Sequence, residues 1–395
     1  MHLPKLNFKL LLIISIILLS IGISLFIGFP KLIRKMISGK INVAPGSEIR
    51  PLYEKPPFFI HFRIRVFNIT NKEEVIQGKK PKLDEIGPYF FEEWKEKFDI
   101  VDDEMEDTIT YHYRNKFIFR KDLSGPGLTG DEIVTMPHPL MMGMLLAANI
   151  DKKPMVPMLG GAINSLFHNP ADAFFTGRVM DLLYDGVPID CSSKQVAAFA
   201  VILNKISFSK YFLFSNKKIK FWLVLGFSHS QTNNTDLGEF KVYRGLKNSQ
   251  DLGRVISFNG DTEMNTWDED ECNQYVGTDS TIFPSFMNVQ DGIWAYEPSI
   301  CRSLGATYRS KTKHNGIPVL RYEMDMGEKI NEKQCFCRSE NECPPKGTID
   351  LFKCSGMPMI ASLPHFYKAE QLLDGIESGL NPNKTQHGIE MLFEI

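Results

Sequence analysis

Three of the chain's seven cysteines fall within nine positions, in the segment CFCRSENEC at residues 335–343. Thiols at such close spacing can hold a metal ion, exchange electrons or form disulfide bonds. The spacing C-x-C-x5-C matches neither the C-x2-C pair of common zinc sites nor the C-x-x-C of thioredoxin-like redox sites. The pattern alone leaves the three chemistries open, and the compartment of the segment has to decide among them.

The segment GPGLTG at residues 125–130 matches the G-x-G-x-x-G pattern of dinucleotide-binding loops, and Asp151 follows at a suitable distance. Pro137 and Pro139 would interrupt the phosphate-binding helix that must come next, and no alternating series of strands and helices follows. A glycine-rich turn that leaves a strand is therefore the favoured interpretation.

Other motifs of enzyme chemistry are missing from the sequence, including G-x-S-x-G, H-E-x-x-H and the phosphate-binding loop. The nine histidines show no ligand pairing at helical spacing. We expect His138, between two prolines, to be a structural turn residue. Met141, Met142 and Met144 suit either core packing or an adaptable apolar surface. We therefore predict no catalytic residue, no metal site and no cofactor, and the ligand-binding residues stay unassigned.

The element that places these residues in a compartment is an uncharged apolar run at residues 10–29. Its length of about 20 residues suffices to cross a hydrocarbon core of roughly 30 Å. A membrane anchor and a cleaved signal peptide are the two interpretations. The run is longer than an ordinary signal core and no A-x-A site follows, which favours an anchor preceded by a short cytoplasmic tail at residues 1–9.

The orientation of this anchor is set by two conflicting signals. Four basic residues follow the run and two precede it, so the positive-inside rule puts the following flank in the cytosol. Three N-x-S/T sequons favour the opposite side, at Asn68, Asn233 and Asn383. Six cysteines clustered within residues 272–354 indicate a disulfide framework in an oxidising compartment. We therefore place residues 30–395 outside the cytosol.

The composition is that of an ordinary globular protein, with 43% hydrophobic and 23% charged residues. The net charge of −2 argues against a nucleic-acid partner. The acidic stretch DIVDDEMED at residues 99–107 lacks the ligand spacing and turn glycine of a calcium loop. We expect it to be a solvated loop between strands.

Hydrophobic periodicity predicts strands first, then helices, then strands again. The strands are expected at residues 56–70, 108–119 and 221–227. The helices are expected at residues 139–150, 170–186 and 193–206. This order predicts a mainly β, α+β fold with segregated elements.

Four segments, in order along the chain, resemble the class B scavenger receptor family: PGSEIRPLYEKPPFFIHFRIRVFNITN, GKKPKLDEIGPYFFEEWKEKFDIVDDE, LTGDEIVTMPHPLMMG and YVGTDSTIFPSF. Within it, the first three are most similar to the first subgroup of insect sensory neuron membrane proteins. The resemblance implies two membrane helices around one glycosylated ectodomain. It also implies an antiparallel β-barrel-like ectodomain with many short helices, a helical apex bundle at about residues 138–206 and an internal apolar tunnel for lipids.

The resemblance further implies how the cysteines pair: Cys272–Cys335, Cys301–Cys354 and Cys337–Cys343. Cys191 is then left over, and we expect it to be a buried thiol. Some relatives carry a lysine cluster at the apex, whereas this chain has His168, Asn169, Asp172 and Arg178 there. That difference argues against an anionic-ligand site at the apex.

The chain stops at Ile395. The family continues with further ectodomain strands and a second membrane helix. We therefore expect a truncated isoform or an incomplete gene model.

The resemblance implies a non-enzymatic co-receptor in the plasma membrane of olfactory neurons, with its ectodomain extracellular. Hydrophobic ligands, such as lipids and fatty-acid-derived pheromones, would pass through the tunnel toward the membrane and an odorant receptor with its co-receptor. The alternative within the family is a scavenger receptor for lipids, lipoproteins or apoptotic cells. Expression in olfactory neurons rather than blood cells or gut discriminates between the two. A membrane-anchored enzyme would need a nucleophile and base that the sequence does not reveal.

Overall fold

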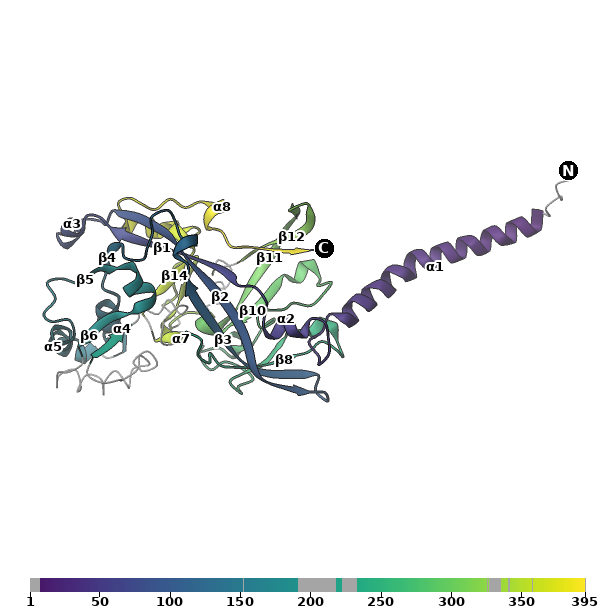
Figure 1. Ribbon diagram of the computed structural model, residues 1–395, viewed down its shortest axis with the longest axis horizontal. Helices are drawn as coiled ribbons and strands as arrows, with labels where there is room; N and C mark the ends of the chain where they lie inside the picture. Colours follow the sequence, from purple (N-terminus) through teal and green to yellow (C-terminus); the bar gives the residue numbers. More distant parts are fainter. Residues whose placement is uncertain are drawn as a thin grey trace.

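The computed structural model describes residues 8–151, 153–190, 218–221, 233–324, 326, 335–339, 342–356 and 358–394. Its first element, α1 (Phe8–Lys40), extends away from the rest of the chain as one long helix (Figure 1). The apolar side chains of α1 are exposed on every side of the helix. Such a surface is stable in lipid rather than in water, and by length and composition α1 is the one candidate membrane span among the described residues.

The largest sheet is antiparallel and has five strands in the order β1-β2-β3-β8-β9. Their bounds are β1 (Ile60–Ile69), β2 (Leu83–Asp103), β3 (Thr108–Phe119), β8 (Glu239–Tyr243) and β9 (Val255–Phe258). β1 and β3 confirm the two strands that alternation predicted. β2 was not predicted, although its 21 residues make it the longest strand described. Register shifts against both neighbours allow this long strand to bend.

A second antiparallel sheet has the order β10-β11-β12-β15. Its strands are β10 (Ile293–Glu297), β11 (Arg302–His314), β12 (Ile317–Met324) and β15 (Glu390–Glu394). Three two-stranded sheets are also present in the described ranges: β4 (Ile133–Pro137) with β5 (Phe174–Arg178), β6 (Val187–Asp190) with β7 (Lys218–Phe221), and β13 (Thr348–Asp350) with β14 (Ile360–Ser362). Among the described residues no sheet closes on itself, so the fold is a mixed arrangement of helices and strands without a closed barrel.

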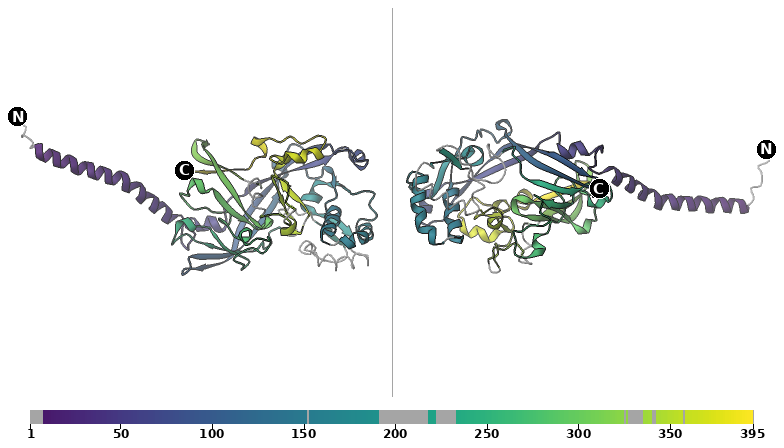
Figure 2. Two further views of the ribbon diagram at one scale, coloured as in Figure 1. Left: turned by 180° about the vertical axis from the view of Figure 1, so that it is seen from behind. Right: turned by 90° about the horizontal axis from the view of Figure 1, so that it is seen from below.

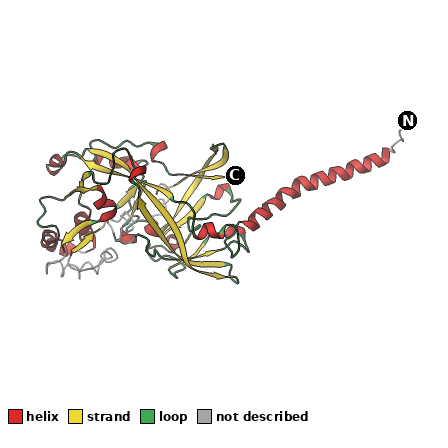
Figure 3. Ribbon diagram, in the orientation of Figure 1, coloured by secondary structure: helices red, strands yellow, loops and turns green. Residues whose placement is uncertain are grey.

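Two longer helices, α4 (Pro139–Asp151) and α5 (Val156–Leu166), lie at the end of the globular part away from α1 (Figures 1 and 2). The short helices are α2 (Arg50–Glu54), α3 (Lys72–Ile76), α7 (Phe352–Ser355) and α8 (Lys384–His387). Figure 3 shows the long strands running through the globular part, with helices around them. α4 confirms the helix predicted at residues 139–150.

The helix predicted at residues 170–186 is wrong over most of its length. Residues 174–178 form β5, which pairs with β4 so that Val134 lies opposite Gly177. Only residues 179–185 are helical, and Asp181–Asp185 form a single wide turn. The apolar spacing suited a helix, but pairing with a strand some 40 residues earlier prevailed, as tertiary context overrides local pattern. The helix predicted at residues 193–206 and most of the strand at 221–227 lie outside the described residues.

The apolar core is divided into clusters that follow these elements. One joins α4 to α5 and includes Leu140, Met144 and Leu159. A second lies between β1–β3 and β5, and a third packs the segment after α1 against β3, β8 and β9. Val43 and Tyr53 of that segment are buried in the third cluster. The segment that follows α1 is therefore packed on the sheet rather than being a loose linker.

Candidate functional site

The six clustered cysteines are joined in the structure as Cys272–Cys335, Cys301–Cys354 and Cys337–Cys343, the pairs that the resemblance implied. The bridges span 63, 53 and 6 residues of sequence, respectively. All three sulfurs of the 335–343 segment are thus engaged. Across the described ranges, no group of three or more His, Cys, Asp and Glu side chains gathers as a metal site. Cys191 lies outside the described residues.

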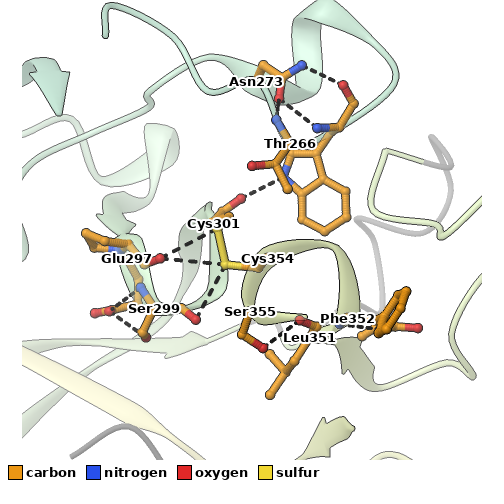
Figure 4. The surroundings of a disulfide bond; sticks show 12 residues. Thr266, Asn273, Glu297, Ser299, Cys301, Leu351, Phe352, Cys354 and Ser355 are labelled. Atoms are coloured by element: carbon orange, nitrogen blue, oxygen red, sulfur yellow. Dashed lines mark hydrogen bonds between the residues drawn. A yellow bond between two sulfur atoms is a disulfide. The ribbon is translucent and has the colours of Figure 1, made fainter. Parts of the chain in front are cut away.

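The Cys301–Cys354 bridge ties the start of β11 to α7 (Figure 4). Next to it, Trp267 Nε1 donates a hydrogen bond of 2.6 Å to the carbonyl oxygen of Cys301. The fully buried guanidinium of Arg302 lies 5.4 Å from the ring centre of Trp267 and 4.2 Å from that of Phe336. Burial lowers the pKa of Arg302 to about 10, and contact with two aromatic faces offsets part of the cost of that burial. These contacts give the region a structural role.

The three sequon asparagines lie in different surroundings. Asn383 is exposed, and its Oδ1 accepts hydrogen bonds from the backbone of Thr385 and Gln386 at the start of α8. Asn68 is half-buried in β1. Asn233 is held on both sides by Phe117, because its Oδ1 accepts from the Phe117 N–H at 2.7 Å and its Nδ2 donates to the Phe117 oxygen at 2.8 Å. A glycan bonds to Nδ2, so Asn233 can keep only one N–H for protein contacts once glycosylated.

At the helical end, His138 is buried at the start of α4 and packs edge-on against Phe167, with ring centres 4.5 Å apart. Burial lowers the pKa of His138 to about 4, so the ring is neutral at physiological pH. Met141 and Met144 are 4% and 2% exposed, which places two of the three methionines in the core, while Met142 is half-buried. The packing gives His138 a structural role.

The charged residues that stand in place of an apical lysine cluster are already paired. Asp172 lies 2.7 Å from Lys72 Nζ, and Arg178 contacts three carboxylates, those of Asp131, Asp181 and Asp185, at 2.7–3.0 Å. The guanidinium therefore has little capacity left for an anionic ligand.

A network of ion pairs binds the segment after α1 to the large sheet. Arg50 of α2 makes two bonds to the carboxylate of Asp102, at 2.8 and 3.0 Å. Arg244 lies 3.2 Å from both Asp102 Oδ1 and Asp107 Oδ1. Burial opposes ionisation of Asp102, but the two guanidinium partners prevail and its pKa is lowered. The prediction of a solvated loop at residues 99–107 holds only for the exposed turn at residues 104–106 between β2 and β3. It is wrong for the rest, because β2 runs to Asp103 and Asp107 is 3% exposed.

A second buried polar cluster lies beside this network. The carboxylate of Asp279 accepts hydrogen bonds from the hydroxyls of Tyr53 at 2.7 Å and Tyr111 at 2.5 Å. Lys97 Nζ lies 3.7 Å from the same carboxylate and donates to Thr281 Oγ1 at 2.8 Å. Burial lowers the pKa of Lys97 to about 8. The cluster joins α2, β2, β3 and the 279–281 loop at one point.

Sequence reasoning did not identify these two clusters, although a signal was present. Arg50 and Tyr53 lie in the first family-like segment, Lys97 and Asp102 in the second, and Asp279 in the fourth. Segments that carried the resemblance thus meet in space at the junction between α1 and the large sheet. The arrangement positions and stiffens the base of the globular part.

Comparison with known proteins shows a match between residues 13–395 and the CD36 family. Several similar insect proteins are named sensory neuron membrane protein 1. The protein from Anopheles gambiae is 46% identical over 100% of this chain and 72% of its own length. The protein from Aedes aegypti is 46% identical over 90% of this chain and 65% of its own length. The protein from Manduca sexta is 40% identical over 94% of this chain and 72% of its own length. This chain therefore spans between 65% and 72% of the length of these relatives.

Proposed function

The chain belongs to the CD36 family, and on that premise we propose that it is a lipid- and pheromone-binding co-receptor of olfactory neurons. The observation that carries the proposal is the match along the chain to insect proteins named sensory neuron membrane protein 1. It is a membrane protein with an apolar N-terminal helix. In the proposal, residues 10–29 span the plasma membrane, residues 1–9 are cytoplasmic and residues 30–395 are extracellular.

The proposed action is to carry apolar ligands out of water and toward the bilayer. Fatty-acid-derived ligands gain roughly 0.8 kcal/mol for each methylene removed from water, so an apolar tunnel binds them chiefly by burial. The ion pairs around Asp102 and the cluster around Asp279 support this role, because they fix the globular part to its membrane anchor. A ligand released at the base would then enter the membrane near an odorant receptor and its co-receptor.

An extracellular setting agrees with the chemistry of the chain. Three disulfides are stable in an oxidising compartment, and sequons are glycosylated only on the lumenal side. We propose glycosylation at Asn68, Asn233 and Asn383, with Asn383 the most accessible of the three.

Co-expression with a pheromone receptor and its co-receptor tests the proposal. We expect the chain to sharpen the onset and decay of responses to long-chain ligands more than to short, water-soluble odorants, because only the former need a route out of water. Equal effects on both ligand classes would contradict the conduit. That outcome would favour the alternative in the family, a scavenger receptor for lipids, lipoproteins or apoptotic cells.

A further inference from the structure

One exposed aromatic side chain lies directly against the membrane helix. The guanidinium carbon of Arg34 in α1 is 5.4 Å from the ring centre of Phe286. One turn further along α1, the hydroxyl oxygens of Ser38 and Ser285 are 3.2 Å apart. The loop at residues 280–287 therefore contacts α1 at two successive levels, which fixes its height along the helix.

That height follows from the sequence of α1. The uncharged run ends at Phe29, and Arg34 is five residues further on. At 1.5 Å per residue, Arg34 lies about 7.5 Å beyond the end of the run. The hydrocarbon core is roughly 30 Å thick and the whole bilayer roughly 40–45 Å, so each headgroup layer occupies about 5–8 Å. Phe286 is thus level with the headgroups when α1 spans the membrane.

The loop holds Phe286 outward by its own geometry. Its neighbours Phe283 and Met287 pack inward on the cluster of Ile293, Ala306 and Tyr322, whereas Phe286 is 47% exposed. Phe286 has a φ of 55°, a conformation that bulky residues rarely adopt. The Ser285 carbonyl oxygen accepts a 3.0 Å hydrogen bond from Gln250 Nε2, which fastens the loop to the globular part. A strained backbone conformation that holds an aromatic ring at the surface suggests that the ring binds a partner.

We propose that the loop at residues 280–287 is a second membrane contact of this chain, with the ring of Phe286 seated among phospholipid headgroups beside Arg34. The occupant follows from continuity with α1, which carries the loop to the bilayer surface. Lys31, Arg34 and Lys35 are exposed on α1 at the same level, so anionic headgroups fit the local charge. Aromatic rings and snorkelling basic side chains both favour this layer. The contact would fix how the globular part tilts over the membrane.

Photo-cross-linking of the full chain in vesicles of phosphatidylcholine and phosphatidylserine tests the contact. A photoreactive phenylalanine analogue replaces Phe286 in one variant and Ile76 in the control. Ile76 is 51% exposed on α3, at the end of the molecule away from α1 (Figure 1). We expect lipid adducts at position 286 at a several-fold higher yield than at position 76, and a higher yield with more phosphatidylserine. No lipid adduct at 286, equal yields at both positions or capture of protein instead of lipid would overturn the proposal.

A second variant keeps the test open if the analogue prevents folding. Phe286→Trp adds one indole to the chain, and brominated phospholipids quench indole fluorescence only on contact. We expect more quenching in this variant than in the unsubstituted chain. Equal quenching in the two chains would place residue 286 outside the bilayer and refute the contact. The outcome is independent of whether the protein carries pheromones.

Discussion

His365 and His387 stack face to face, with ring centres 4.1 Å apart and planes within 9° of each other. Each Nδ1 accepts a backbone N–H, from Asn381 at 3.1 Å for His365 and from Asn383 at 3.0 Å for His387. His365 Nε2 lies 2.8 Å from Glu85 of β2. An imidazole whose Nδ1 accepts a hydrogen bond has no proton on that nitrogen, so this contact favours the neutral form of His387. The stack joins two segments, the turn that follows β14 and the helix α8, and the contact with Glu85 holds both against the large sheet.

This stack predicts acid sensitivity of the fold. Burial and the adjacent His365 lower the pKa of His387, with Arg65 acting in the same direction and Glu85 against it. An unfolded histidine titrates near 6.5, so below roughly that pH the unfolded chain binds more protons than the native one. Stability is therefore lost as pH falls below about 6.5 and is retained above it. We expect His387→Asn, which keeps an acceptor near the Nδ1 position, to flatten the dependence of Tm on pH in this range.

His314→Asn is the matched control for the stack, because His314 is exposed at the end of β11. It should leave the pH dependence of Tm unchanged. An H387N variant with the same pH slope as the parent chain would show that the stack does not couple protonation to folding.

The carboxylate of Asp102 should be among the positions most sensitive to substitution where the segment after α1 meets the large sheet. Asp102→Asn leaves Arg50 and Arg244 facing each other without the charge that separates them. Loss of one partner from a buried ion pair costs about 3–5 kcal/mol, and the partial exposure of Asp102 argues for the lower figure. Glu104→Gln makes the same charge change at an exposed position of the same hairpin. In denaturant unfolding in detergent, the Asp102→Asn variant should have a clearly lower midpoint than the Glu104→Gln variant. Equal midpoints would show that the ion pairs of Asp102 do not stabilise the fold.

The disulfides should differ in their contribution to stability. In the loop-entropy estimate, the 53-residue separation of Cys301–Cys354 corresponds to about 4 kcal/mol, and the 6-residue separation of Cys337–Cys343 to about 2 kcal/mol. Replacing both cysteines of the Cys301–Cys354 bridge by serine should therefore lower the free energy of unfolding more than the same change at the Cys337–Cys343 bridge. Non-reducing peptide mapping of the parent chain should first recover Cys337 linked to Cys343. Free thiols at all six positions, or bound zinc, would contradict the framework.

Glycosylation tests the proposed orientation, and the structure suggests how to remove each sequon. Asn233→Gln would break the paired hydrogen bonds to Phe117 and so combine a folding defect with the loss of a glycan. Thr70→Ala and Thr235→Ala abolish two sequons while keeping both asparagines. We expect a glycosidase-sensitive mobility shift in the parent chain and a smaller shift in each variant. A parent chain without any shift would support the inverted orientation that the flanking charges indicate.

The sequence predicted elements whose partners lie close by or whose pattern admits one interpretation. β1 alternates from Ile60 to Val66 and β3 from Ile109 to Tyr113, and α4 buries residues 140, 144 and 147 at helical spacing, so local pattern and tertiary burial agree there. β5 was predicted as a helix, because Phe174 and Phe175 suit either period and the pairing with β4 lies outside any local window. Non-local pairing decided that element.

The polar residues at the base of the globular part escaped prediction for a related reason. A run of acidic residues is usually solvated. Here ion pairs with Arg50 and Arg244, which belong to distant segments, offset the free-energy cost of burying Asp102 and Asp107. The cysteine pairing likewise came from family resemblance, since six cysteines permit 15 pairings. The local sequence pattern therefore could not predict contacts between residues that lie far apart in the sequence.

Binding of a homologous series of long-chain esters, aldehydes or acids to the purified chain tests the proposed lipid conduit most directly. The account predicts that affinity rises with chain length, by up to roughly 0.8 kcal/mol for each methylene, until the ligand outgrows the tunnel. It also predicts a weak dependence on salt, because Asp172 and Arg178 near the helical end are already paired. Affinity without a chain-length trend, or binding that weakens steeply with salt, would contradict it.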